Sequence, residues 1–264
     1  MSNVSGNLTV STSPTALQLA QRLVPSFVTV QNADFTGNAA ARGSFSGGNS
    51  CGLPIDSGVI LSSGPISNAV GPNNRPGDYY DPDFPTPPYD IGGDSQLEGL
   101  VGNGETLDAA VLEFDVTSPN AFELKFRFVY ASEEYPNFIG AYNDPMGIFV
   151  GGVNIAFVPG TTQPVSVSTI NGGCVAGPAI PASHPEFYSD NYDSDHSSSE
   201  RAVPAPIFNV QYDGMTILLE ARVQIPANAS RHVKIAIADY DPGTADRILD
   251  SAVFLGNWQP DECQ

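Results

Sequence analysis

The densest group of residues capable of chemistry lies in YASEEYPNFIGAYNDPMGIFV, residues 130–150. Glu133 and Glu134 end one predicted strand, and Asn143 and Asp144 come just before the next. A hairpin-like connection would bring these oxygen-bearing side chains to one rim of a sheet. Adjacent carboxylates repel each other unless a cation or a proton neutralises them, and a hard cation with about six to eight oxygen ligands does so. The alternative is that Glu134 and Asp144 accept backbone N–H bonds in turns.

A second acidic group lies in ADYDPGTADRILDS, residues 238–251, directly after another predicted strand. Asp239 ends that strand and Asp250 begins the next, so both can reach the same rim. Asp241 and Asp246 lie between them, and an Asp-rich turn is the alternative interpretation. The predicted ion is Ca²⁺, which selects oxygen ligands. Its predicted ligands are Glu133, Glu134, Asn143, Asp144, Asp239 and Asp250.

A third acidic stretch contains Asp190, Asn191, Asp193 and Asp195. Its spacing is similar to that of an EF-hand loop, but the glycine at the sixth position and the closing glutamate are absent. A solvated run of charges is the interpretation that we favour here.

None of the catalytic patterns has the context that it needs. Residues 48–52, GNSCG, match G-x-S-x-G, but a nucleophile elbow needs a hydrophobic strand before it and a helix after it; FSG precedes and LPID follows. Glu133 and Glu134 would point to opposite faces of a strand, so they do not form the facing acid–base pair of a glycosidase. The three histidines show no H-E-x-x-H spacing. We therefore expect a protein that is not an enzyme.

The formal net charge is −19, from 29 acidic and 10 basic residues. Nucleic acid and anionic membrane surfaces would repel such a chain, whereas cations are attracted. The alternative is that the charge only keeps the protein soluble. No run of 18 apolar residues predicts a membrane span, and no signal peptide is recognisable at the start.

The elements that must position these side chains are mostly strands. The clearest is Phe122–Tyr130, in which aromatic or aliphatic residues alternate with Glu123, Lys125 and Arg127. Further strands are predicted at 27–30, 58–62, 110–116, 147–150, 153–158, 165–170, 216–223, 232–238 and 252–255. Without βαβ alternation, this pattern predicts an antiparallel, jelly-roll-like β-sandwich. We expect one domain over residues 1–264.

Two short helices accompany the strands. Ser13 is the predicted cap of the first and Pro14 its first residue; its predicted apolar face comprises Leu17, Leu19, Ala20, Leu23 and Val24. The second is predicted to start at Asp94, with Leu97, Leu100 and Val101 inward.

The chain has three cysteines, Cys51, Cys174 and Cys263. Cys51 and Cys174 lie in similar glycine-rich contexts, GGNSCG and NGGCVAG, and we predict a disulfide between them in an oxidising compartment. Two buried or loop thiols are the alternative.

Several segments, in order along the chain, resemble the bacterial choice-of-anchor L family. They span about residues 7 to 256, and they are NLTVSTSPTALQLAQRLV, IDSGVILSSGPISNAVGPN, GDSQLEGLVG, DAAVLEFDV, FRFVYASEEYPNF…YNDPMGIFV and IAIADYDPGTADRILDSAVFLG. The resemblance implies an extracellular or cell-surface module, similar to adhesin and matrix modules more than to enzymes. No anchoring signal is recognisable at the end, NWQPDECQ, and Pro145 and the Cys51/Cys174 pair depart from the family pattern.

We therefore expect a secreted or cell-surface calcium-binding module for adhesion or contact with the extracellular matrix. Its expected partner is a surface or matrix protein or a glycan, and self-association is possible in principle. The first alternative is a self-assembling structural subunit of an extracellular fibre or surface layer, which size-exclusion chromatography with and without calcium would distinguish. A hydrolase is the second alternative, and no convergent nucleophile and base support it.

Overall fold

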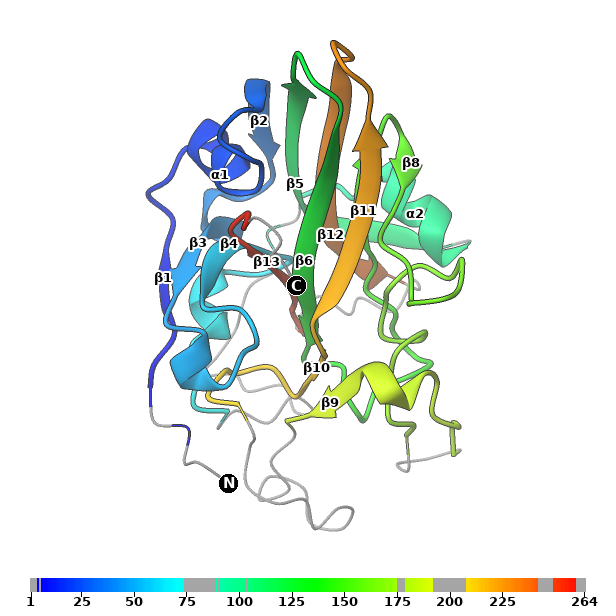
Figure 1. The fold of residues 1–264 in the computed structure, drawn as a ribbon. Helices are drawn as coiled ribbons and strands as arrows, with labels where there is room; N and C mark the ends of the chain where they lie inside the picture. Colours follow the sequence, from blue (N-terminus) through cyan, green and yellow to red (C-terminus); the bar gives the residue numbers. More distant parts are fainter. Residues whose placement is uncertain are drawn as a thin grey trace.

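Two antiparallel β-sheets face each other (Figure 1). The structure is a computed structural model that describes residues 4, 6–73, 89, 91–102, 104–174, 179–191, 208–241 and 249–259. The first sheet has the order β1-β3-β4-β13-β6-β10-β9, and β11 also pairs with β6. The second has the order β2-β5-β12-β7-β8. The prediction of an all-β antiparallel sandwich is confirmed.

The strands are short except at the centre of each sheet. The first sheet contains β1 (Thr9–Ser11), β3 (Arg42–Ser46), β4 (Ser57–Ser62), β6 (Phe122–Ser132), β9 (Tyr188–Asp190), β10 (Gly214–Thr216), β11 (Leu219–Ile225) and β13 (Ser251–Gly256). The second contains β2 (Thr29–Thr36), β5 (Glu105–Thr117), β7 (Met146–Val150), β8 (Val153–Asn154) and β12 (Arg231–Asp241).

The main core lies between the two sheets. The alternation of apolar and polar residues along β6 explains how the first sheet contributes to that core. Leu124, Phe126 and Phe128 are buried, while the residues between them are partly exposed on the other face. Phe114 of β5 and Ile235 of β12 belong to the same buried cluster. Full burial of each such side chain contributes about 1.5–3 kcal/mol, so the predicted period-two pattern also specifies which face turns inward.

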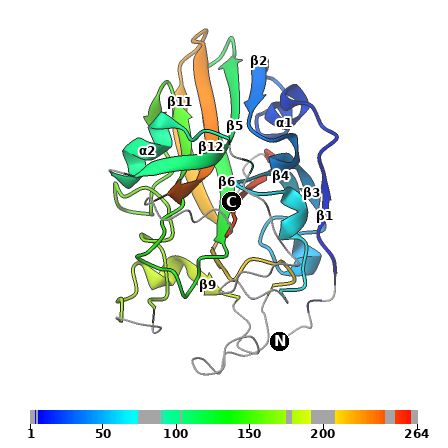
Figure 2. The same cartoon turned by 180° about the vertical axis from the view of Figure 1, so that it is seen from behind.

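The outer face of the second sheet is partly covered by α2 (Ser95–Val101) (Figure 2). Leu97 of α2 packs in a cluster with Val111, Phe149 and Ala236 of that sheet. The helix begins at Asp94 as predicted, because the Asp94 carboxylate accepts hydrogen bonds from the amides of residues 96 and 97.

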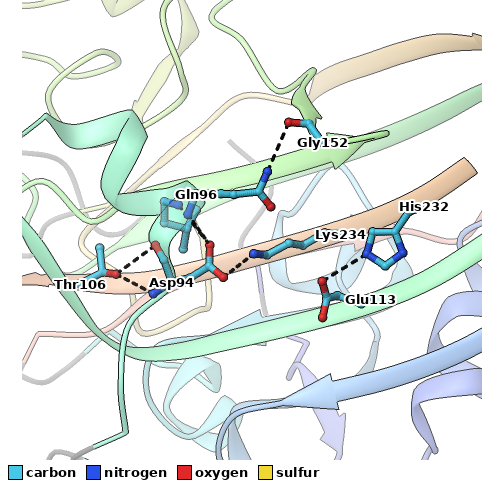
Figure 3. Close-up of polar contacts among 8 residues, drawn as sticks. Asp94, Gln96, Thr106, Glu113, Gly152, His232 and Lys234 are labelled. Atoms are coloured by element: carbon cyan, nitrogen blue, oxygen red, sulfur yellow. Dashed lines mark hydrogen bonds and ion pairs between the residues drawn. The ribbon is translucent and has the colours of Figure 1, made fainter.

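Figure 3 shows how α2 is fixed to the sheet. Lys234 of β12, only 8% exposed, pairs with the Asp94 carboxylate, and its ammonium lies 5.8 Å from the centre of the Phe149 ring. The Asp94 amide donates to Thr106 Oγ1 at 2.9 Å, and Gln96 donates to the Gly152 carbonyl at 3.3 Å. The ion pair and the hydrogen bonds therefore hold the start of α2 against β5 and β12.

The first helix, α1 (Ala16–Arg22), begins two residues later than predicted. Its cap is Thr15, which forms a capping box with Gln18: the Gln18 amide donates to Thr15 Oγ1, and the Thr15 amide donates to Gln18 Oε1. Ser13 takes no part in this cap. Leu19, Ala20, Leu23 and Val24 are buried as predicted, but Leu17 is exposed. No helix in the described ranges has the length and apolarity needed to cross a membrane.

Two strand predictions differ from the structure because side chains take over backbone hydrogen bonds. Residues 165–170 form a loop, in which Thr169 Oγ1 accepts from the Ser166 amide and donates to the Pro164 carbonyl. The strand predicted at 216–223 is divided into β10 and β11, and Thr216 Oγ1 accepts from the Tyr130 amide where the ladder is interrupted.

The predicted disulfide between Cys51 and Cys174 is wrong. Both cysteines are buried, and they are not joined by a disulfide. Cys51 belongs to the cluster on the outer face of the first sheet, whereas Cys174 packs against the central core. Their sulfurs contact different carbonyls, Gly6 O and Asn137 O. The local structures also differ, because Cys51 ends a short 3₁₀ helix whereas Cys174 forms an isolated bridge with Ile180. Cys263 lies outside the described residues.

Candidate metal centre

Two connections between the sheets meet at one end of the sandwich. After β6 the chain crosses from the first sheet to β7 in the second, and after β12 it crosses back to β13 in the first. The hairpin that we expected after β6 is therefore wrong. The register nevertheless brings the acidic ends together, because Ser132 pairs with Ser251 and Met146 pairs with Ile237.

Hydrogen bonds fix the two crossings against each other. The Glu133 amide donates to the Asp250 carbonyl at 3.2 Å, and the Ala238 amide donates to the Pro145 carbonyl at 3.2 Å. The Tyr240 amide donates to Asp144 Oδ1 at 2.8 Å. The residues after β6 thus lie beside those before β13, and the residues before β7 lie beside the end of β12.

Five buried carboxylates gather around these crossings, and we call them the acidic cluster: Asp108, Glu134, Asp144, Asp239 and Asp250. Each is at most 5% exposed. Aspartate and glutamate are almost never fully buried without a partner, so five buried together require an explanation.

Part of the acidic cluster is held by hydrogen-bond donors. The hydroxyls of Ser132 and Ser251 donate to Glu134 Oε2, and the Asn68 amide group donates to Asp250 Oδ2 at 2.9 Å. Asp108, which has a left-handed backbone with φ of 51°, accepts the amides of Tyr89 and Ile91 at 3.0 and 2.8 Å.

Two carboxylate oxygens in the acidic cluster have no hydrogen-bond donor, Asp144 Oδ2 and Asp239 Oδ1. The carboxyl groups of Glu134 and Asp239 lie beside Asp144, but two ionised carboxylates cannot bond to each other. They can interact favourably only by sharing a proton or by ligating a cation between them.

Burial dominates the acidity of these groups. It raises the pKa of Asp144 to about 6, against the lowering effect of the neighbouring Glu134 carboxyl group and of the hydrogen bond from the Tyr240 amide. Burial, followed by repulsion from Asp144 and Asp250, raises the pKa of Asp239 well above its ordinary value. A raised carboxyl pKa means that the site favours a neutral or cation-bound state over bare charge.

The carboxylates do not form a complete metal site as they stand. Within the described residues, no group of three or more His, Cys, Asp or Glu side chains is arranged to hold a metal ion. A cation would therefore need side-chain rotation, or it would take hydroxyl, carbonyl or water oxygens in addition to two carboxylates.

The sequence-predicted ligands differ in where they lie. Glu134, Asp144, Asp239 and Asp250 belong to the acidic cluster. Glu133 lies near enough to Tyr212 to influence its pKa, as do Asp250 and Asp239, so Glu133 borders the cluster. Asn143 directs its side-chain oxygen to the Ser168 amide at 2.9 Å instead and shapes the neighbouring loop.

Asp108 is the member of the acidic cluster that sequence reasoning missed. It lies in β5, three residues after the start of that strand, and it is brought to Asp239 by the pairing of β5 with β12. The available signal was a lone aspartate, in TLDAAV, at the edge of a strongly apolar segment.

The residues considered for catalysis have ordinary structural contacts. Ser50 Oγ donates to the Gly47 carbonyl in a short 3₁₀ turn. His184 contacts the Thr169 carbonyl, and His232 lies between Glu113 and Asp115 on an exposed face. His196 lies outside the described residues, as do Asp193, Asp195 and Asp246.

Comparison with known proteins gives one match. The family model of the Choice-of-anchor L domain matches residues 8–258. Neither the curated proteins nor the solved structures contain a significant match.

Proposed function

Because this chain belongs to the Choice-of-anchor L family, a family of surface-associated modules, we propose that it is a module for adhesion or extracellular contact whose two sheets are joined by a calcium ion in the acidic cluster. The single observation that carries the calcium proposal is the pair of buried oxygens without a donor, Asp144 Oδ2 and Asp239 Oδ1.

The donor chemistry favours a hard cation. The acidic cluster offers carboxylate and serine hydroxyl oxygens, and the two described cysteines and the two described histidines contact other parts of the chain. Zinc and copper prefer nitrogen and sulfur ligands, whereas calcium takes oxygens in irregular geometries. Magnesium demands a nearly ideal octahedron, which the side chains as they stand do not supply.

The hydrogen-bond donors around each carboxylate indicate which carboxylates are the main ligands of the proposed calcium ion. Asp108 is compensated by two amides and Asp250 by Asn68. Glu134, Asp144 and Asp239 remain as the group in which two oxygens have no donor. One doubly charged ion among these three leaves a small residual charge that the serine hydroxyls on Glu134 can stabilise.

Such an ion would act between the sheets. Glu134 lies two residues after the end of β6 of the first sheet, whereas Asp144 lies just before β7 and Asp239 lies in β12 of the second. The proposal therefore links calcium outside a cell to the rigidity of the module, and through that rigidity to the surface that contacts a partner.

Calorimetric titration of Ca²⁺ into chelator-treated protein tests this proposal. We expect binding to the unmodified protein, at least about tenfold weaker binding to Asp144→Ala, and no change for Asp34→Ala, a matched aspartate on the exposed side of β2. Equal affinities for both variants would contradict the proposal. A larger loss for Asp193→Ala would assign the ion to the 190–195 stretch instead.

A further inference from the structure

The Asp144 residue of the acidic cluster is followed by proline, and its own peptide carbonyl is also held in the cluster. Tyr130 OH donates a hydrogen bond to the Asp144 carbonyl oxygen at 3.0 Å, and the same hydroxyl lies 3.2 Å from Ser251 Oγ. Asp144, Pro145 and Tyr130 are all buried. The Asp144–Pro145 bond is therefore a buried tertiary amide with an O–H group aimed at its oxygen.

The carboxylate of Asp144 belongs to the same residue as the carbonyl carbon of that bond, so it can reach this carbon without moving another part of the chain. Oδ1 is held by the Tyr240 amide at 2.8 Å, and Oδ2 has no donor, so its lone pairs are available. Closure of a carboxylate oxygen on the carbonyl carbon of the same residue forms a five-membered ring, and intramolecular attack of this kind gains greatly from proximity. The Tyr130 hydroxyl is where a donor to the developing oxyanion must be.

We propose that the chain cuts its own Asp144–Pro145 peptide bond in a single self-processing event. The carboxylate oxygen attacks the carbonyl carbon, and Tyr130 stabilises the negative charge on the carbonyl oxygen. The C–N bond then breaks, and the proline nitrogen takes a proton from water and becomes a free amine. The cyclic anhydride left at Asp144 is opened by water to two carboxylates, so one water molecule is consumed overall.

The cleavage reaction itself does not require the proposed calcium site. The regulation of its rate by calcium, however, does rest on that proposed site. A cation bound by Asp144 would occupy the attacking oxygen, so calcium slows the cut and its removal permits it. The fragments 1–144 and 145–264 would stay together in solution, because β5 pairs with β12 and β6 pairs with β13 across the break. Cutting would release the tether between the sheets and leave the sandwich assembled.

The sequence contains an internal comparison. Asp–Pro bonds occur at 81–82, 144–145 and 241–242. General acid lability would cut all three, whereas the contacts of Tyr130 and Tyr240 are expected to favour cutting at 144–145; residues 81, 82 and 242 lie outside the described residues.

The test is incubation of the full chain at neutral pH, with EDTA or with Ca²⁺, followed by mass spectrometry under denaturing conditions. We expect two fragments whose masses sum to the intact mass plus one water, a new amino terminus at Pro145, and slower cutting in Ca²⁺. Tyr130→Phe should slow the cut by roughly a hundredfold, as loss of one oxyanion donor does. Hydroxylamine should trap the anhydride as a hydroxamate on Asp144 of the unmodified protein, a readout that needs no variant.

An intact chain after prolonged incubation in EDTA would overturn the self-cleavage proposal, as would cutting at all three Asp–Pro bonds or an unmodified Asp144 in hydroxylamine. Cutting that is unchanged by Tyr130→Phe would indicate a contaminating protease and would also overturn it. Calcium titration of Pro145→Ala, which retains every carboxylate and should resist cutting, tests the cation site separately.

Discussion

At the scale of single residues, the two carboxylate oxygens without donors dominate the chemistry. A buried polar group without a partner costs about 1–3 kcal/mol, and more when it is charged. Asp144 and Asp239 each carry one such oxygen, and they face each other across the strand pairing of β7 and β12. The fold accepts this cost only if something neutralises the charge, and a proton or a cation can do so.

Substitution of Asp144 by asparagine separates stability from calcium binding. In metal-free protein the neutral amide removes repulsion with Glu134 and Asp239, so we expect Asp144→Asn to raise the free energy of unfolding by about 1–3 kcal/mol. The same variant should lose its response to calcium. Thermal melts in EDTA and in Ca²⁺ check both effects, with Asp34→Asn as the control. A destabilised variant that keeps the full calcium response would refute this assignment.

The pH dependence of metal-free protein follows from the raised pKa of Asp144. Burial raises this pKa to about 6, whereas an unfolded aspartate titrates near 4. Between these values the folded protein binds more protons than the unfolded chain, so stability falls as pH rises, by about 3 kcal/mol in total. The neighbours that set this response are Glu134, Asp239, Asp250 and Asp108. Urea unfolding at pH 4.5 to 7, in EDTA, measures it.

His232 supplies a second pH response that must be separated from the first. Hydrogen bonds with Asp115 and Glu113 outweigh desolvation and raise its pKa. The contribution of His232 to the free energy of unfolding is complete below the pKa of histidine in the unfolded chain. It is lost as pH rises through the pKa of His232 in the folded protein. His232→Gln should remove the fall in stability above about pH 6.5 and leave the fall between 4 and 6. Loss of both phases in this variant would contradict the role of Asp144.

At the scale of elements, the pair formed by Lys234 and Asp94 anchors α2 to the second sheet. Its side chains are 10% and 14% exposed, and removal of one partner from a buried pair typically costs about 3–5 kcal/mol. We expect Lys234→Met to lower the free energy of unfolding by about 3 kcal/mol. Arg222→Met, at an exposed pair with Glu123 and Glu220, should change it by less than about 1 kcal/mol. Equal effects in denaturant melts would contradict the anchoring role.

The elements also differ in how far the sequence predicts them. The strand predicted at Phe122–Tyr130 became β6 because its apolar face is buried between two sheets. The short strands β1, β3 and β9, of which β1 and β9 lie at the sheet edges, were missed, since their few residues carry little apolar alternation and their pairing comes from neighbours. Residues 153–158 reduce to a two-residue strand because the Asn154 side chain bonds the amides of Ile148 and Ala156.

The candidate site was predictable where ligands lie at strand ends, and less so elsewhere. Asp144 and Asp239 were identifiable because each lies at the boundary of an apolar run. Asp108 reaches them only through the long-range register of β5 on β12, which the sequence does not specify. The exclusion of Asn143 depends on a contact with Ser168, twenty-five residues away.

At the scale of the whole molecule, the net charge of −19 opposes contact between copies of the chain. We therefore expect one species of monomer size in size-exclusion chromatography at low ionic strength, with and without calcium. Calcium-dependent appearance of large assemblies would favour the alternative of a self-assembling fibre or surface-layer subunit.

The central claim is that a cation in the acidic cluster joins the two sheets, and thermal melting of one preparation in EDTA and in excess Ca²⁺ tests it most directly. At a hundredfold excess over the dissociation constant, mass action predicts about 2.7 kcal/mol of stabilisation, or roughly 5–10 °C in Tm for a chain of this size. The shift should disappear in Asp144→Ala and persist in Asp34→Ala. Superimposable melts of the unmodified protein in EDTA and in Ca²⁺ would contradict the account.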